Sequence, residues 1–331
     1  MDSAVLEDAL SQLERIRHNY LKNGGQPEPD SSRQWQPRSG LWNQLQDMTR
    51  LLPGLHTETV TVDGHRIRYW RLGSGDNTPV VLLHGFGAGK ESWATLLPML
   101  WQSNRSFYVL DLPGFGESTY RHDASYRYGA QAQRMAEWAR TIGLPAAHWV
   151  GSSMGGAICA TLGAHHPERV ATLTLMNAAG MGSAQLSPME RELVEGRNPL
   201  IPSSRGEVRK LFRITTYRNQ RLISQAMTPA LWREMTHRQP ANRHIFADML
   251  QPEEPVPKLL GQVSAPTLII WGERDRIVDV SCAYRYSALL PNARVEVMRN
   301  VGHLPMLEVP LRCASLMKTF WKRAGSLPYQ A

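Results

Sequence analysis

Cysteine is scarce in this chain, and long apolar runs are missing. The three cysteines among 331 residues are widely spaced and odd in number: Cys159, Cys282 and Cys313. They form no C-x-x-C pair, which excludes a disulfide framework and a cysteine metal site. No stretch approaches the roughly 20 apolar residues that cross a bilayer. The acidic N-terminus also lacks a secretory signal. We therefore predict a cytoplasmic protein.

Positive charge is in excess but is not gathered into a tail. The 37 Lys and Arg against 29 Asp and Glu give a net charge of +8. Without a known binding motif, this excess predicts no nucleic-acid partner. Seven basic residues between positions 197 and 221 face one acid, Glu207: Arg197, Arg205, Arg209, Lys210, Arg213, Arg218 and Arg221. Such a segment is either a solvated helix face or a surface for anionic lipid headgroups.

The first 52 residues are predicted to form a helical extension. Apolar residues recur at helical spacing over residues 1–22 and again over 41–52, where Pro53 ends the pattern. Residues 23–40 are rich in Gly, Pro, Ser and Gln, which is typical of a linker. We expect the two apolar stripes to pack on the protein, with membrane contact as the alternative.

From Thr57 onward, short apolar runs alternate with helical patterns. Eight runs predict strands: Thr57–Val62, Arg66–Leu72, Val80–Leu83, Phe107–Leu110, His148–Val150, Leu173–Met176, Thr267–Trp271 and Val295–Met298. Four patterns predict helices: Ala130–Ile142, Gly155–His165, Cys282–Leu290 and Leu311–Lys322. The alternation predicts an α/β fold with a mainly parallel, eight-stranded sheet covered by helices on both faces.

The alternation lapses for about 90 residues after Met176. This interval is polar, Arg-rich and interrupted by prolines, so we predict helices inserted between two strands as a cap. The expected divisions are an extension at 1–52, an α/β core at 53–180 and 261–325, and the cap at 181–260.

A G-x-S-x-G pattern follows a predicted strand and opens a small-residue helix. It reads Gly151-Ser152-Ser153-Met154-Gly155. In this context the central Ser153 stands at a sharp turn, where Gly151 and Gly155 leave room for a strained backbone. Ser152 is the competing nucleophile, but the glycine spacing centres on Ser153. The structural alternative is an ordinary helix N-cap.

Asp275 and His303 follow the last two predicted strands, so the chain order is Ser, Asp, His. They lie four and five residues beyond the apolar runs, where functional groups gather in parallel sheets. This order is one in which catalytic triads occur. Asn177 ends the strand after the nucleophile but supplies no carboxylate, and Asp279 is the fallback acid.

His84-Gly85-Phe86-Gly87 follows an early predicted strand. Gly85 and Gly87 would let the backbone approach a ligand. We predict the Phe86 and Met154 N–H groups as oxyanion donors, each worth about 3–4 kcal/mol. Nucleophile, base, acid and donors complete the set for acyl transfer. We therefore expect no cofactor and no metal.

Five motifs together resemble the α/β-hydrolase superfamily over about residues 57–322. They are His84-Gly85-Phe86-Gly87, Asp111-Leu112-Pro113-Gly114-Phe115-Gly116, Ser152-Ser153-Met154-Gly155-Gly156, Trp271-Gly272-Glu273-Arg274-Asp275 and Val301-Gly302-His303. More narrowly, they resemble bacterial family V lipases and membrane-associated monoacylglycerol lipases of animals, as does Asn198-Pro199-Leu200-Ile201-Pro202. Membrane-bound relatives carry an N-terminal transmembrane helix, which the first 50 or so residues here do not show.

The resemblance implies a capped α/β-hydrolase fold and a serine carboxylic ester hydrolase, an esterase or lipase of fatty-acyl esters such as monoacylglycerols. The alternatives are a carbon–carbon bond hydrolase of aromatic degradation and a non-catalytic binding protein on this fold. Epoxide hydrolases and haloalkane dehalogenases need a carboxylate at position 153. The expected partners are the ester substrate and, through the basic cap or the N-terminal helices, the inner face of a membrane. The sequence predicts no oligomeric state.

Overall fold

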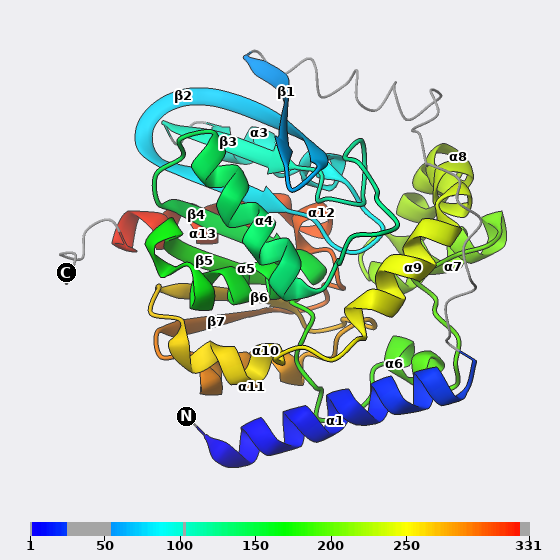
Figure 1. Cartoon of the computed structure of the whole chain (residues 1–331). Helices are drawn as coiled ribbons and strands as arrows, with labels where there is room; N and C mark the ends of the chain where they lie inside the picture. Colours follow the sequence, from blue (N-terminus) through cyan, green and yellow to red (C-terminus); the bar gives the residue numbers. More distant parts are fainter. Residues whose placement is uncertain (1, 25–53, 102–103, 325–331) are drawn as a thin grey trace.

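Seven strands form one sheet in the described part of the computed structural model, which covers residues 2–24, 54–101 and 104–324 (Figure 1). They are β1 (Leu55–Val62), β2 (His65–Leu83), β3 (Arg105–Leu110), β4 (Ala147–Ser152), β5 (Val170–Met176), β6 (Thr267–Gly272) and β7 (Ala293–Met298). The order is β1-β2-β4-β5-β6-β7, with β3 paired to β2. The pairs from β4 to β7 are parallel, so the sheet is mainly parallel, as predicted.

β2 accounts for two of the eight predicted strands. Its first half pairs with β1 and its last four residues pair with β4. β3 pairs with both halves, because Phe107 lies opposite Leu72 and also opposite Val80. The chain between these halves stays in extended pairing near the start of β3. The described sheet therefore has seven strands instead of eight, since Arg66–Leu72 and Val80–Leu83 belong to one continuous strand.

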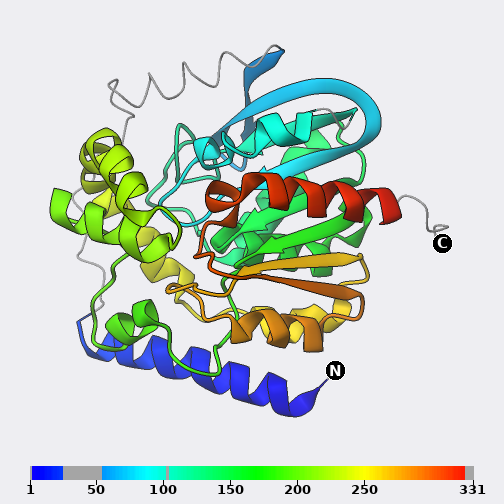
Figure 2. The same cartoon turned by 180° about the vertical axis from the view of Figure 1, so that it is seen from behind.

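Helices cover both faces of the sheet, which explains why its central strands are apolar on both sides. In β6, Ile269 and Trp271 belong to one core, whereas Leu268 and Ile270 belong to the other. The first face is covered by α4 (Tyr128–Thr141), α5 (Met154–His165) and α11 (Ser281–Leu289), and the second by α3 (Leu97–Leu100) and α13 (Pro310–Ala324) (Figures 1 and 2). Short helices complete this core: η1 (Lys90–Trp93), η3 (Pro167–Arg169), η4 (Leu260–Gln262) and α12 (Pro305–Glu308).

Helices occupy the chain between β5 and β6. They are α6 (Pro188–Val194), α7 (Arg205–Thr215), α8 (Gln220–His237), α9 (Gln239–Met249) and α10 (Val256–Leu259). Serine caps start two of them: Ser187 and Glu190 form a capping box on α6, and Ser204 Oγ accepts from Glu207 N at 3.2 Å on α7. α7, α8 and α9 lie together beyond one end of the sheet (Figure 1).

The N-terminal helix α1 (Ser3–Lys22) packs against α6, α10 and α11 (Figure 1). Its apolar stripe lies inside the protein, where Ala9, Ile16 and Tyr20 are buried. Arg17 Nε also donates to Leu250 O at 2.6 Å. The second predicted N-terminal helix, residues 41–52, lies outside the described residues. Among the helices that the structure describes, none combines the length and the apolar character needed to span a membrane.

Candidate active site

Ser153 stands between β4 and α5 at a strained turn. Its φ is 53° and its ψ is −117°, a conformation that residues with a side chain rarely adopt and that costs of order 1–3 kcal/mol. A Cβ at Gly151 would lie 2.1 Å from Gly155 O, and one at Gly155 would lie 2.3 Å from Leu83 O. Close backbone contact therefore requires both glycines, and the turn has the geometry that exposes a nucleophile.

The neighbouring Ser152 is the last residue of β4 and is fully buried. Its hydroxyl has no hydrogen-bond partner in the described part of the chain. Ser153 is half-buried instead. A Cβ built on Gly85 would lie 3.1 Å from Ser153 Cβ and 3.7 Å from Ser153 Oγ. The loop that begins at His84 thus lies against the side chain of Ser153, whereas from Ser152 it meets the backbone oxygen, 3.5 Å from the same Cβ.

Asp275 and His303 lie in contact just beyond β6 and β7. His303 Nδ1 and Asp275 Oδ2 are 2.7 Å apart, and both residues are buried. The other carboxylate oxygen, Asp275 Oδ1, accepts from Ile277 N at 2.7 Å and from Val278 N at 3.1 Å. No hydrogen bond between the Ser153 hydroxyl and His303 occurs within the described residues. In structures without substrate such contacts are often long and tighten on binding.

Asn177, at the end of β5, also contacts the acid. Its Nδ2 donates to Asp275 Oδ2 at 2.6 Å, and its backbone is left-handed with φ of 46°. The sequence presents this residue as an alternative position for the acid, whereas the structure makes it a hydrogen-bond donor to Asp275. The fallback acid Asp279 has a different place, because its Oδ1 accepts from Ser281 N at 3.0 Å at the start of α11.

The two predicted oxyanion donors lie on opposite sides of Ser153 in the chain. Met154 is the first residue of α5, so its N–H precedes the helical hydrogen bonds. Neither Met154 N–H nor Phe86 N–H has an acceptor among the described residues. Gly87 has a φ of +68°, and a Cβ there would lie 3.8 Å from Leu200 O and 3.9 Å from Asn242 Nδ2. The loop therefore faces the inserted helices.

His84 fixes the start of this loop and takes no part in proton transfer. Its Nε2 accepts from Leu112 N at 3.0 Å, so its Nδ1 carries the proton that it donates to Gly85 O at 2.7 Å. Burial lowers the pKa of His84 to about 4. The side chain is therefore neutral at physiological pH and serves as a rigid link between two loops.

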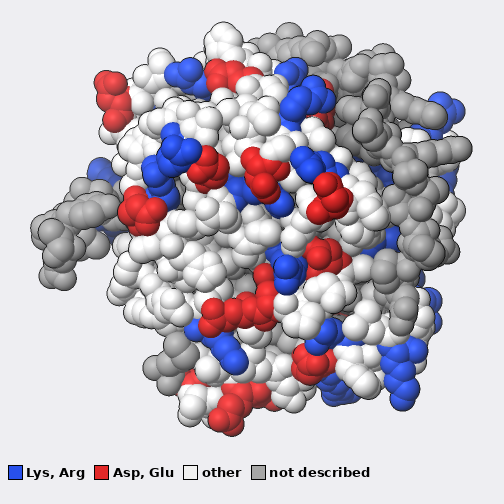
Figure 3. Space-filling view, viewed as in Figure 1, with Lys and Arg blue, Asp and Glu red and all other residues white. Residues whose placement is uncertain are grey.

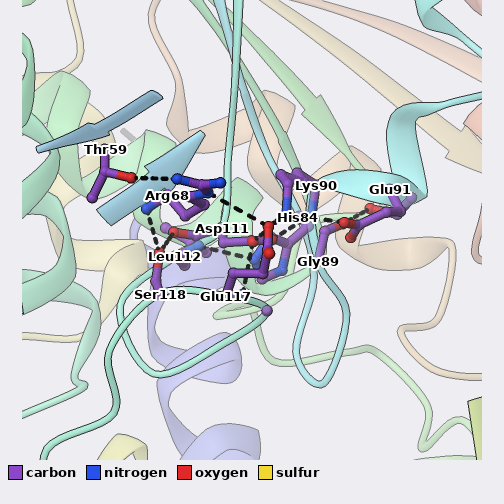
Figure 4. Close-up of polar contacts among 12 residues, drawn as sticks. Thr59, Arg68, His84, Gly89, Lys90, Glu91, Asp111, Leu112, Glu117 and Ser118 are labelled. Atoms are coloured by element: carbon purple, nitrogen blue, oxygen red, sulfur yellow. Dashed lines mark hydrogen bonds and ion pairs between the residues drawn. The ribbon is translucent and has the colours of Figure 1, made fainter. Parts of the chain in front are cut away.

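A buried ionic cluster holds the other end of the loop (Figure 4). Lys90 Nζ lies 2.7 Å from Asp111 Oδ2, 2.7 Å from Glu117 Oε2 and 3.0 Å from Glu91 Oε1. Lys90 N also donates to Asp111 Oδ1 at 2.8 Å. Burial opposes the charge on Lys90, but Asp111, Glu91 and Glu117 raise its pKa above the ordinary value. The cluster joins the loop at 84–90 to the glycine loop at 111–118.

One carboxyl of this cluster has an unusual acidity. Burial, followed by the charge of Asp111, raises the pKa of Glu91 to about 7. The charge of Lys90, opposed by burial, holds the pKa of Asp111 below its ordinary value. Because three carboxyls share one ammonium, Glu91 is the member that keeps a proton near neutrality.

The assembled groups suit acyl transfer. A strained serine, a buried Asp–His pair and two backbone donors follow the ends of four parallel strands, β2, β4, β6 and β7. Within the described residues, no group of His, Cys, Asp and Glu side chains is arranged to hold a metal ion. Two contacts near the site did not follow from the sequence: Asn177, weighed there only as an acid, donates to Asp275, and Glu308 accepts from Gly302 N and Tyr217 N.

The chain matches known lipases over most of its length. It is 29% identical over 280 residues to monoacylglycerol lipase abhd6-B of Xenopus laevis, covering 81% of this chain and 82% of that protein. It is 29% identical over 259 residues to Lipase 1 of Psychrobacter immobilis, covering 78% and 81%.

Solved structures agree with these matches. A membrane phospholipase A described as a bacterial virulence factor is similar at 34% identity and a TM-score of 0.79, covering 87% of this chain and 92% of that one. A meta-cleavage product hydrolase of Pseudomonas fluorescens shares the fold at 23% identity and a TM-score of 0.66, covering 81% and 98%. The sequence model of the alpha/beta hydrolase fold family matches residues 78–310. The chain therefore belongs to the alpha/beta hydrolase fold family.

Proposed function

We propose that this carboxylic ester hydrolase uses Ser153 as nucleophile, His303 as general base and Asp275 as the acid that orients the base. The observation that carries the proposal is the buried 2.7 Å contact between Asp275 and His303, beyond the same edge of the sheet as the strained Ser153 turn. With Nδ1–H donated to Asp275, His303 keeps Nε2 free of a proton and able to act as a base.

The reaction proceeds through an acyl-enzyme. Ser153 Oγ attacks the ester carbonyl while its proton moves to His303 Nε2, and the Phe86 and Met154 N–H groups stabilise the oxyanion. His303 then returns the proton to the leaving alcohol, and the acyl group stays on Ser153. Water gives its proton to His303 as it attacks the acyl carbon. The fatty acid leaves, Ser153 regains its proton, and no cofactor is consumed.

The proposed substrates are medium- or long-chain fatty-acyl esters, with monoacylglycerols as the first class to test. Support comes from the relatives named monoacylglycerol lipase and lipase. The proposed donor Phe86 also packs edge-on against Phe115 and Phe246, with ring centroids 5.5 Å apart in both pairs. Phe246 belongs to α9, so an aromatic wall for an acyl chain would combine the core with residues 181–260.

We assign residues 181–260 as the cap, 1–52 as the extension, and 53–180 with 261–325 as the core.

We further propose that the cap contacts anionic membranes as a peripheral surface. Its exposed arginines on α7, on the following turn and at the start of α8 form the cap arginine surface: Arg205, Arg209, Arg213, Arg218 and Arg221. Three of them recur every four residues, so they share one face of α7. No carboxylate of the described residues forms a salt bridge with any of the five. Near anionic headgroups each contributes about 1 kcal/mol.

The apolar element of this contact is Leu222, which is 67% exposed beside Arg221. The N-terminal helix α1 offers no comparable surface, because its apolar stripe packs on α6, α10 and α11. Between the cap and α1, the proposal therefore takes the cap.

Hydrolysis of p-nitrophenyl esters of increasing chain length tests the proposed reaction. We expect faster turnover of medium and long chains than of acetate, and for Ser153→Ala a loss of about a thousandfold or more. A folded Ser153→Ala enzyme that keeps several per cent of the activity would overturn the assignment. A dienoic acid substrate assayed in parallel tests the alternative hypothesis of a carbon–carbon bond hydrolase. Preferential cleavage of the dienoic acid would support that alternative.

Sedimentation with vesicles tests the membrane contact. We expect binding to phosphatidylcholine vesicles containing phosphatidylglycerol, weakened by salt and by Arg209→Glu with Arg213→Glu. The control pair, Arg312→Glu with Lys322→Glu on α13, makes the same change in net charge at exposed positions. Equal losses in both pairs would mean that binding follows net charge alone, which contradicts a defined surface.

A further inference from the structure

The turn between α7 and α8 lies directly on the loop that carries His303. His303 N donates to Thr215 O, the last residue of α7, at 2.8 Å. A Cβ built on Gly302 would lie 2.8 Å from Tyr217 N and 3.0 Å from the Thr216 carbonyl carbon. A side chain at position 302 would therefore separate the two segments. Cap and histidine loop meet through their backbones.

Glu308 joins these two backbones with a single carboxylate. Its Oε1 accepts from Gly302 N at 2.9 Å, while its Oε2 accepts from Tyr217 N at 2.9 Å and from Arg218 N at 2.7 Å. One oxygen thus serves the histidine loop and the other serves the turn. Burial raises the pKa of Glu308, against the lowering effect of these donors.

Helix formation does not explain a carboxylate at this position. Glu308 ends the one-turn helix α12 and precedes α13, which begins at Pro310. Its carboxylate nevertheless accepts from Gly302, Tyr217 and Arg218 N, which belong to neither helix. Its three backbone donors come from other segments, one from the histidine loop and two from the cap. The carboxylate therefore suits the junction between these two segments, because both of its oxygens accept hydrogen bonds. A glutamine amide could not replace it, since its NH2 group would face a backbone N–H donor.

We propose that Glu308 is a positioning residue that clamps the Tyr217–Arg218 turn onto Gly302 and so holds the His303 ring in register with Ser153. This rests on the proposed function, in which His303 is the base. We call the contacts of Glu308 with Gly302, Tyr217 and Arg218 the Glu308 clasp. Through it, the cap segment that bears Arg218 supports the catalytic base. Loss of the clasp then impairs the chemical step more than ester binding.

Glu308→Gln and Glu308→Ala test the clasp in the full-length enzyme, with Glu253 as a matched control. Like Glu308, Glu253 is a half-buried carboxylate with a pKa raised by burial. It accepts from two backbone donors, Tyr128 N at 3.1 Å and Gly129 N at 3.2 Å. It does not touch Ser153, Asp275 or His303. The measurements are kcat and KM for an acyl ester, the rate of fluorophosphonate labelling, and trypsin cleavage after Arg218.

We expect both Glu308 variants to lower kcat by about ten- to a hundredfold, because small displacements of a catalytic group cost that much. KM should change less, labelling should slow in parallel with kcat, and cleavage after Arg218 should accelerate. Glu253→Gln and Glu253→Ala should leave all four measurements near wild type. If Glu308→Ala fails to fold, the nearly isosteric Glu308→Gln decides.

Wild-type kcat and labelling rate in Glu308→Gln would overturn the clasp, as would an equal loss in Glu253→Gln. These outcomes differ from failure of the proposed function. In that case the wild-type enzyme itself would resist labelling, or Ser153→Ala would label as fast as the wild type.

Discussion

The Asp275 carboxylate is the most constrained group in the candidate site. One oxygen accepts from the Ile277 and Val278 N–H groups, and the other lies against Asn177 and His303. The proposed triad positions are predictable from the sequence, because each lies within five residues of the end of an apolar run whose end is fixed by the sheet. The role of Asn177 is not, since it depends on the pairing of β5 with β6, which spacing along the chain does not reveal.

Replacing Asn177 by glycine should weaken catalysis without straining the backbone, because glycine adopts a positive φ freely. The lost hydrogen bond to a charged group is worth roughly 1.5 kcal/mol, so kcat/KM should fall about tenfold. Asn104→Gly is the control, as Asn104 is also left-handed, with φ of 50°, and lies at the start of β3. Unchanged kcat/KM in Asn177→Gly would show that the amide does not support Asp275.

The Lys90 cluster predicts a pH dependence of stability. The folded pKa of Glu91, about 7, lies above its unfolded value, so the folded state holds the proton more tightly. The stability linked to this proton is present below the unfolded pKa and is lost as pH rises through about 7.

The Glu91→Gln variant has no ionisable side chain at this position. Its free energy of unfolding should therefore fall less than that of the wild type as the pH rises from mildly acidic to mildly alkaline. Urea unfolding at several pH values measures the difference. Parallel curves for the two proteins would mean that Glu91 titrates normally in the folded state.

At the scale of elements, the strands are far more predictable than the cap. Apolar runs flanked by glycine turns identify buried strands, because both faces of a parallel sheet need apolar side chains. The cap helices follow no such rule. α8 continues through Pro229, although a proline in the sequence predicts the end of a helix. The burial of α8 depends on contacts with the core. One such contact is made by the buried Arg238, which lies between α8 and α9 as the C-cap of α8. Its guanidinium donates to Gly114 O and Gly116 O and lies over Phe115.

Arg238→Met keeps the bulk of this side chain and removes its donors. One buried and one half-buried carbonyl would then lose this donor, and the free energy of unfolding should fall by roughly 2–4 kcal/mol. Amide exchange should accelerate in residues 114–117 and in α9. The control Arg233→Met replaces an exposed residue of α8 that lies over Trp232 and should stay within about 0.5 kcal/mol of wild type. Equal stability of the two variants would show that Arg238 does not anchor the cap.

At the scale of the whole molecule, charge is distributed unevenly over the surface. Basic and acidic side chains are intermingled on the face in Figure 3, whereas the cap arginine surface carries one sign. The sequence shows this clustering, but exposure and the lack of acidic partners require the structure. The fold class is predictable because alternating strands and helices leave few ways to build a parallel sheet. The placement of α1 is not, since an amphipathic helix fits a protein surface and a membrane equally well.

Site-mapped labelling with a fluorophosphonate is the most direct test of the proposed active site. Mass spectrometry of the wild-type enzyme should find one adduct, on Ser153 and not on Ser152. His303→Ala should slow its formation by about a thousandfold or more, because the base is lost. An adduct on another serine, or a labelling rate unaffected by His303→Ala, would contradict the proposed active site.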